Sequence, residues 1–101
     1  MIKLSGKINR IFDSQTFETF EKRIFWMEDN FNENYPNIFA LELWNKDCKM
    51  IDNYSVGDYI TAYIDVKGKH WQRDGKEGVM NTLKCWNIEK EGVLFKPIKQ
   101  S

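Results

Sequence analysis

A two-residue alternation over residues 58–73 constrains the fold of this chain more than any other feature. The even positions from residue 60 to Val66 are apolar, and the odd positions as far as Lys67 are polar or tyrosine. This period places the apolar side chains on one face of a β-strand, directed towards a core. After Gly68 the strand continues into a run of cationic side chains around one tryptophan. Core packing does not explain such a run, which instead suits an anionic, flat ligand.

The length and charge of the chain limit the kind of protein it forms. Its 101 residues predict one domain with a single core, and we expect residues 1–90 to form it and residues 91–101 to be a short C-terminal extension. The formal net charge of 0 excludes a strongly basic nucleic-acid binder, so any electrostatic site must be a local patch. Aromatic residues make up 15% of the chain, more than a core of this size needs, so some rings are expected at the surface.

The cysteines and the single histidine do not predict a metal site. Cys48 and Cys85 lie far apart, and with His70 they lack the spacing of a zinc site. We expect both cysteines to be reduced core residues in a cytoplasmic protein that needs no cofactor. No apolar run approaches the ~20 residues that span a bilayer, and the first ten residues lack the apolar segment of a secretion signal. No membrane association is therefore expected.

Five strands and one short helix are predicted along the chain. The strands cover residues 2–9, 20–29, 38–45, 58–73 and 79–89, with one or two helical turns within residues 46–54. Gly6 interrupts the first strand on its apolar face, which predicts a bulge or a sharp bend. This order matches an all-β OB-fold with one short helix, a five-stranded, partly open Greek-key barrel.

For three of the strands, the sequence differs in how clearly it predicts which face points towards the core. In residues 38–45, Phe39, Leu41 and Leu43 share the core side, so Trp44 points away from the core. In residues 20–29 both faces mix polar and apolar side chains, and the pattern leaves open which face looks inward. In the last strand the apolar positions change parity after Cys85, which indicates either a bulge or a strand covered on both sides.

Binding is better supported than catalysis. His70 belongs to no nucleophile motif, and no glycine-rich phosphate loop is present, so we do not expect an enzyme. Between residues 66 and 76, four cations surround Trp71 and outnumber a single anion. Proteins that hold single-stranded nucleic acid combine a positive groove with rings on which bases stack. The alternative is a solvated hairpin with a tryptophan packed against its stem.

An ordered set of short motifs carries a resemblance to a known family. The motifs are Phe20-Glu21-Lys22-Arg23, Leu41-Glu42-Leu43-Trp44-Asn45, Val56-Gly57-Asp58, Gly68-Lys69-His70-Trp71 and Asn81-Thr82-Leu83-Lys84-Cys85-Trp86-Asn87-Ile88. Together, over residues 20–88, they resemble single-stranded DNA-binding proteins of the bacterial type, and in particular small SSB-like domains of bacterial and phage genomes. The chain ends in the basic segment FKPIKQS, whereas the bacterial proteins end in an acidic tail that recruits partners.

The resemblance implies individual binding residues. Trp71 and Trp44 correspond to rings that stack bases, and Trp26 is the corresponding ring of the second strand. The lysines beside these rings correspond to phosphate contacts, and Arg73 extends the cationic run. The predicted nucleic-acid-binding residues are therefore Lys22, Trp26, Trp44, Lys46, Lys67, Lys69, Trp71 and Arg73.

The sequence thus predicts a protein that binds single-stranded DNA without sequence preference, with RNA left open. Phosphate neutralisation and base stacking would protect the strand in replication, recombination or repair. The resemblance also implies a homo-oligomer, a dimer or a tetramer. A second hypothesis is an OB module for protein–protein contact or structural assembly, in which exposed rings would be the interface anchors.

Overall fold

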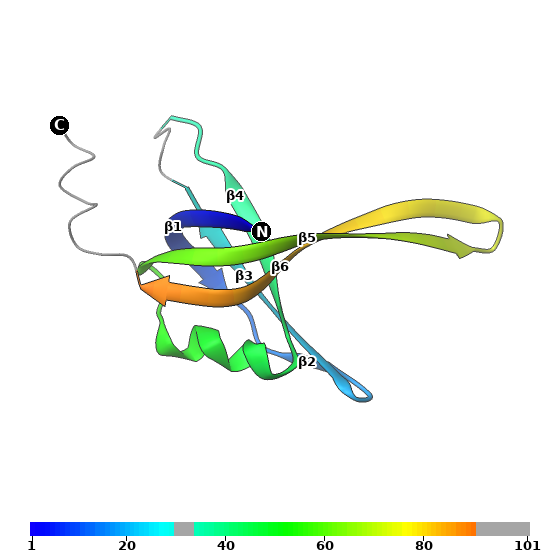
Figure 1. Ribbon diagram of the computed structural model, residues 1–101, viewed down its shortest axis with the longest axis horizontal. Helices are drawn as coiled ribbons and strands as arrows, with labels where there is room; N and C mark the ends of the chain where they lie inside the picture. Colours follow the sequence, from blue (N-terminus) through cyan, green and yellow to red (C-terminus); the bar gives the residue numbers. More distant parts are fainter. Residues whose placement is uncertain (30–33, 91–101) are drawn as a thin grey trace.

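The computed structural model describes residues 1–29 and 34–90, which form a closed sheet with one helix at its end. Its elements are β1 (Ile2–Ile11), β2 (Gln15–Phe17), β3 (Phe20–Glu28), β4 (Ile38–Trp44), the 3-10 helix η1 (Asn45–Asn53), β5 (Tyr59–Arg73) and β6 (Lys76–Lys90). The strand order is β1-β5-β6-β4-β3-β2, and an additional β1–β3 pairing closes the sheet into a ring (Figure 1). The predicted OB-fold and its five strands are confirmed. The short β2 is a sixth strand that the alternation did not predict, and the expected extension at residues 91–101 lies outside the described residues.

Closure of the barrel depends on a bend in β1. Residues 2–7 of β1 pair with β5, and residues 7–11 pair with β3, with a register shift between Ile8 and Arg10. A side chain on Gly6 would collide with the main-chain carbonyl of Glu28, so only glycine lets the two strands approach here. The predicted bend is confirmed, and the irregular pairing lies just after the glycine.

The core contains side chains from every long strand and from η1. Its buried members are Ile8, Phe25, Met27, Leu41, Leu43, Cys48, Ile51, Ile60, Ala62, Ile64, Cys85 and Ile88. The predicted core face of β4 is confirmed. In β3 the inward face is the one that carries Phe25 and Met27, which places Lys22 and Trp26 on the outer surface.

One bulge explains the change of apolar parity in β6. Tyr63 pairs with Asn87 and Ile64 pairs with Cys85, so Trp86 has no partner across the strand pair. The extra residue turns both Cys85 and Ile88 towards the core, although three positions separate them. Trp86 is left at the surface. Of the two predicted explanations, the bulge is the one the structure has.

Beyond the core, β5 and β6 continue as a two-stranded ribbon, here called the arm and comprising residues 66–83. It gives the molecule its longest dimension, 54 Å against 27 and 22 Å, and projects to the right in Figure 1. Val66 was expected in the core, but it is 57% exposed because the arm has already left the barrel at this position. Only Asp74 and Gly75 form the turn, both with positive φ, as in a type I′ hairpin. Residues 76–78, which lay between two predicted strands, therefore belong to β6.

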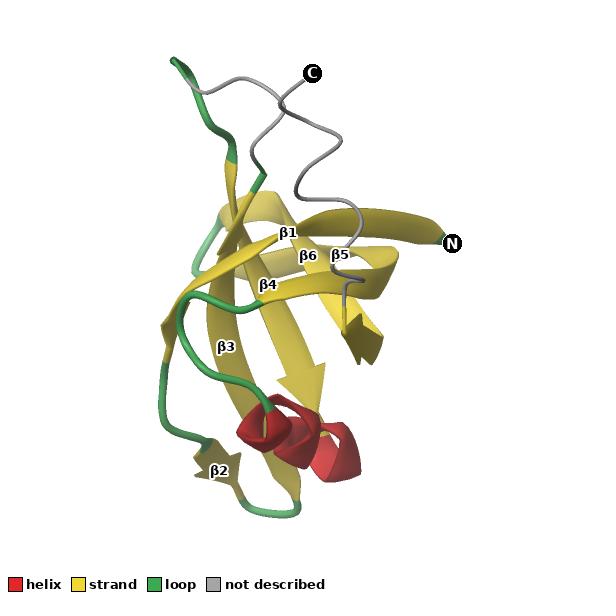
Figure 2. Cartoon of the chain, turned by 90° about the vertical axis from the view of Figure 1, so that its left-hand side faces the viewer, coloured by secondary structure: helices red, strands yellow, loops and turns green. Residues whose placement is uncertain are grey.

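The helix covers one end of the barrel and lies in the lower part of the view in Figure 2. Cys48 and Ile51 are its buried side chains, and the predicted helical turns are confirmed as 3-10 turns. Arg23 fixes this helix to β3. Its Nη1 lies 2.7 Å from Asp52 Oδ1 and donates to the main-chain carbonyl of Cys48, and its Nε donates to the carbonyl of Phe12.

Candidate nucleic-acid interface

The two faces of the arm differ in chemistry. Residues paired across an antiparallel ribbon share a face, and the pairs are Lys67–Thr82, Lys69–Met80, Trp71–Gly78 and Arg73–Lys76. All four cations of the run and Trp71 therefore lie on one side, here called the basic face. The opposite side carries Val66 and Val79, together with a 2.7 Å contact between His70 Nε2 and Glu77 Oε1. The arm thus has one surface suited to an anion and one that is not.

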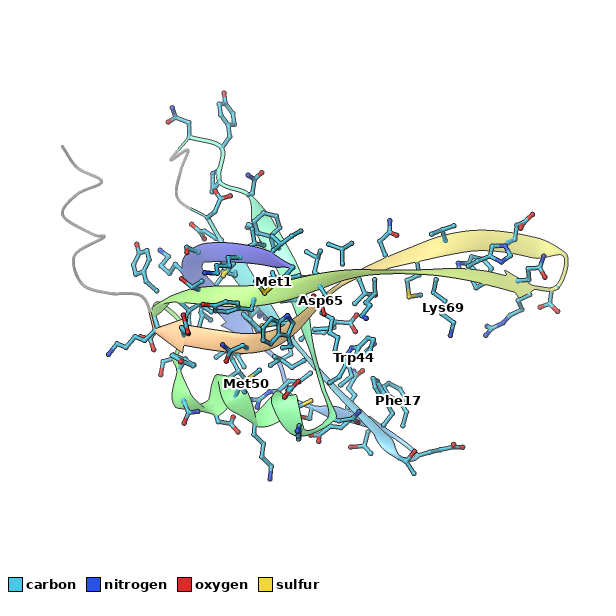
Figure 3. The ribbon with its side chains drawn as sticks, in the orientation of Figure 1. Met1, Phe17, Trp44, Met50, Asp65 and Lys69 are labelled. Carbon is cyan, nitrogen blue, oxygen red and sulfur yellow. The ribbon has the colours of Figure 1, made fainter. Side chains whose placement is uncertain are left out.

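Where the arm leaves the barrel, the basic face meets the outer surfaces of β3 and β4. The two surfaces enclose a groove of about 230 Å³, here called the root groove. It is lined by Phe20, Lys22, Glu42, Trp44, Lys67, Gly68, Lys69, Met80 and Thr82. Figure 3 shows Trp44 at the point from which the β2–β3 hairpin, with Phe17, and the arm, with Lys69, diverge. Four of the eight predicted binding residues line this one groove.

Trp44 is held at its edge and covered on its face. Its indole Nε1 donates to Glu42 Oε1 at 2.9 Å, and its ring meets that of Phe20 edge-on at a centroid distance of 5.5 Å. The Lys84 ammonium lies 4.8 Å from the ring centroid. Such a cation–π contact contributes ~0.5–1 kcal/mol at an exposed site, whereas a stacked base contributes ~1–3 kcal/mol. A base can therefore displace the lysine from the ring.

The position of Trp71 agrees in part with both interpretations of the cationic run, a ring exposed for stacking and a ring packed against the hairpin stem. Its ring lies against Gly78, the residue that pairs with it across the ribbon, so one side of the indole is packed on the stem. The side chain nevertheless remains 41% exposed on the basic face. The packed side fixes the orientation of the ring, and the exposed remainder is available to a ligand.

A second pocket surrounds Trp26. Its ring meets Phe12 edge-on at a centroid distance of 5.0 Å, and the Arg10 guanidinium carbon lies 5.5 Å from the Trp26 centroid. The pocket, of about 210 Å³, is lined by Phe12, Asp13, Gln15, Lys22, Ile24 and Trp26. Lys22 lines both this pocket and the root groove. The predicted pair of Lys22 and Trp26 is therefore on the outer surface, beside the root groove.

Three predicted residues line neither of these pockets, and one of them is Trp71, on the basic face of the arm. Lys46 is exposed in the first turn of η1, and Arg73 lies at the tip of the arm beside the turn. Conversely, the groove includes side chains that were not predicted, Phe20, Met80 and Thr82, and Lys84 covers its tryptophan. Phe17, on the neighbouring hairpin, is half exposed with the Lys22 ammonium 5.7 Å from its ring. The two-residue period of β3 places Phe20 on the same face as Lys22, but nothing in the sequence shows which strands meet at the groove.

The described residues offer little reactive chemistry. Residues 1–29 and 34–90 contain no group of three metal-ligating side chains that could hold an ion. In the same ranges, no helix has the length and apolar character needed to cross a membrane. Cys48 and Cys85 are buried free thiols, and burial raises the pKa of Cys85 to about 12. A thiol that stays protonated is a poor nucleophile and a poor ligand.

Comparison with known proteins places the chain in a family. The family model described as "Domain of unknown function (DUF3127)" matches residues 3–89. The chain belongs to this family. None of the curated proteins compared with this DUF3127 chain matches it.

Solved structures share the fold of the DUF3127 chain. Two crystal structures of Rim1, a mitochondrial single-stranded DNA-binding protein from S. cerevisiae, superpose with TM-scores of 0.68 and 0.67 at 16% and 18% identity, each over 90% of this chain and 95% of Rim1. The small single-stranded DNA-binding protein from Streptomyces coelicolor gives a TM-score of 0.62 at 13% identity, over 89% of this chain and 92% of that protein. These likenesses confirm the SSB-like OB-fold. At such low sequence identities, these structures show that the fold is shared, but they do not identify binding residues in this chain.

Proposed function

We propose that this DUF3127 chain binds single-stranded DNA through the basic face of the arm and the root groove. Lysine side chains neutralise phosphates, and bases stack on Trp44 and Trp71. The observation that carries this proposal is the root groove, where Trp44 and three lysines from β3 and β5 line one channel. Positively charged grooves with stacking rings are the common means of holding single strands.

The position of the groove within the fold supports the same function. OB-folds bind oligonucleotides on the face of their second and third strands, between the loop that joins strands one and two and the loop that joins strands four and five. Here those strands are β3 and β4, and the two loops are the β2–β3 turn and the tip of the arm. The root groove lies on that face, between the two hairpins (Figure 3).

The remaining predicted residues extend the proposed path. Lys22 connects the root groove with the pocket around Trp26, which is large enough to receive a second ring. Arg73 and Lys46 would contact phosphates at the outer ends of the site. The function is non-catalytic protection of the strand during replication, recombination or repair, with RNA as a competing ligand to be tested.

A fluorescence titration tests the proposal. Adding oligothymidylate should quench tryptophan emission, because stacked bases contact Trp44 and Trp71. A Trp86→Phe variant should keep most of the quenching, since Trp86 lies beside Tyr63 at a centroid distance of 5.4 Å and does not line the root groove. Trp44→Phe and Trp71→Phe should each reduce it. Unchanged emission in the unmodified protein would exclude the proposal.

A second candidate is an OB module for protein–protein contact. The exposed Val66 and Val79 favour it, because these two apolar side chains lie on the side of the arm that lacks the four cations. Under this hypothesis the oligonucleotide leaves the emission unchanged, and Val66→Lys abolishes association with a protein partner. Under the proposed function Val66→Lys leaves DNA affinity intact or raises it.

A further inference from the structure

One acidic side chain stands in a groove that otherwise favours anions. Of the nine residues that line the root groove, Glu42 alone is acidic, and three are lysines. A carboxylate repels the phosphates that the lysines attract. Its presence therefore costs affinity for the DNA backbone unless it interacts with another part of the ligand.

The geometry leaves part of the Glu42 carboxylate free. Glu42 and Trp44 are two residues apart in β4 and share its outer face. Only Oε1 is engaged by the Trp44 indole, whereas a carboxylate offers about four acceptor positions. Lys84 pairs with Glu42 across the β4–β6 bridge, yet its ammonium lies over the Trp44 ring, and Glu42 forms no ion pair within the described residues.

We propose that Glu42 reads the exocyclic amino group of the base that stacks on Trp44. This inference rests on the proposed function and adds a base preference at one position of a site that accepts any sequence. A base lying on the indole brings its edge beside the carboxylate that holds the indole edge. Carboxylates accept hydrogen bonds from the N4 amino group of cytosine and are repelled by carbonyl oxygens such as thymine O4. This position therefore prefers cytosine to thymine or uracil.

The lysines of the groove would favour a different base from the one that Glu42 favours, so a preference for cytosine can be attributed to Glu42. Lys22, Lys67 and Lys69 carry donors only, so any contact they make with a base edge favours a carbonyl oxygen. A preference for the amino-bearing base consequently points to Glu42 and not to the rest of the groove. If Glu42 only positioned Trp44, it would alter affinity for all bases alike.

The experiment compares oligodeoxycytidylate with oligodeoxyuridylate of equal length at one salt concentration. The two ligands have the same backbone and charge and differ in the amino or carbonyl group and the adjacent ring nitrogen. The unmodified protein should bind the cytosine ligand about tenfold tighter, the low end for a hydrogen bond to a charged acceptor. An oligonucleotide of N4,N4-dimethylcytosine, which lacks the amino hydrogens, should bind like the uracil ligand.

The matched variant is Glu42→Gln. Its amide oxygen can still accept from the Trp44 indole, but the negative charge is gone. The uracil ligand should bind it more tightly than it binds the unmodified protein, the cytosine ligand should not, and the ratio between them should fall to near one. Equal affinities in the unmodified protein, or a ratio that Glu42→Gln leaves unchanged, would overturn the inference while binding itself persists. Absence of binding to every oligonucleotide would instead overturn the proposed function.

Discussion

The indole ring of Trp71 lies against the backbone of Gly78, its partner across the arm. A β-carbon on residue 78 would be 2.7 Å from Cζ2 of the ring, whereas carbon atoms pack best at about 3.5–4.0 Å. Glycine is unfavourable within a strand because it adds no side-chain packing, and an aromatic ring laid over it restores that packing. The pair therefore stabilises a ribbon that extends beyond the core and sets the orientation of a proposed stacking ring.

Gly78→Ala should weaken DNA binding with little effect on folding. The added methyl group pushes the indole away from the ribbon and so disturbs the stacking surface, at a cost of up to about 1–3 kcal/mol in binding. The free energy of unfolding should change by less than about 1 kcal/mol, because the ring is a partly exposed side chain outside the core. Both are measured by fluorescence titration and chemical denaturation. Gly68→Ala is the control: Gly68 borders the root groove, but a β-carbon there would point to the opposite side of the arm, with Val66, and would meet only Asn81 Oδ1, at 3.5 Å. Equal binding by the two variants would show that Trp71 does not depend on Gly78.

Trp71→Ala and Trp44→Ala should each lose about 1–3 kcal/mol of binding free energy, the value of one base stack. Their effects on folding should differ. Trp71 is largely outside the core, whereas Trp44 packs on Phe20 and bonds to Glu42, so its loss should cost more stability. Phe25 is fully buried, so Phe25→Ala should lower the free energy of unfolding by about 3–5 kcal/mol, and the two tryptophan variants are compared with this value. A Trp71→Ala protein as unstable as the Phe25→Ala protein, with normal binding while folded, would show that this ring serves the fold alone.

Most of the fold could be predicted because it is encoded locally. The alternation in β4 and β5 and the parity change after Cys85 are patterns within single strands, and each gave the correct face or the bulge. The pattern could not show where the core ends. Val66 continues the apolar alternation of Ile60, Ala62 and Ile64, but the barrel lacks neighbours to cover it. The short β2 was missed for a related reason, because three exposed residues carry no alternation that burial would impose.

The candidate site was less predictable because it depends on contacts between distant strands. Trp44 and Lys69 reach the same groove through the β4–β6 pairing, which consists of a single parallel bridge between Glu42 and Lys84. No local pattern specifies such a bridge. Individual residues with the right chemistry were therefore identifiable. The position of Lys84 over Trp44 and the hydrogen bond between the Trp44 indole and Glu42 appear only in the three-dimensional structure.

Lys69→Glu should weaken binding to all sequences about equally, because phosphate contacts carry no base information. The salt dependence gives a second test. If Lys22, Lys67, Lys69 and Lys84 engage phosphates, log K should fall with log salt at a slope of about −3, or −0.7 per contact. The variant should have a shallower slope. Lys49→Glu, on the exposed side of η1, makes the same charge change away from the groove and should alter affinity little. An affinity independent of salt would exclude the basic face as the site.

Lys22 and Arg23 are adjacent cations on opposite faces of β3, and their variants should separate binding from folding. Arg23 is only 17% exposed and bonds to two main-chain carbonyls and to Asp52, which is 60% exposed. Arg23→Met leaves those carbonyls without a partner and should cost about 1–3 kcal/mol of stability, whereas Asp52→Asn should cost less than about 1 kcal/mol. Lys22→Met should weaken DNA binding and leave stability almost unchanged. The assignment fails if Asp52→Asn proves as destabilising as Arg23→Met, because the exposed ion pair would then matter more than the carbonyl contacts.

The buried thiol of Cys85 should make the protein less stable in alkali. Burial raises the pKa of Cys85 from its ordinary value of 9.0 to about 12, because the folded core disfavours the thiolate. Below pH 9 the thiol is protonated in both states and its protonation does not affect the equilibrium. Above pH 9 the unfolded chain releases the proton while the folded protein retains it, so the free energy of unfolding should fall by up to about 1.4 kcal/mol per pH unit until pH 12. Chemical denaturation between pH 8 and 11 measures this slope. Cys85→Ala is the control, since it keeps the lysines and tyrosines that titrate in the same range. The unmodified protein should lose stability more steeply than the variant, and identical slopes would show that the thiol ionises as readily in the folded protein as in the unfolded chain.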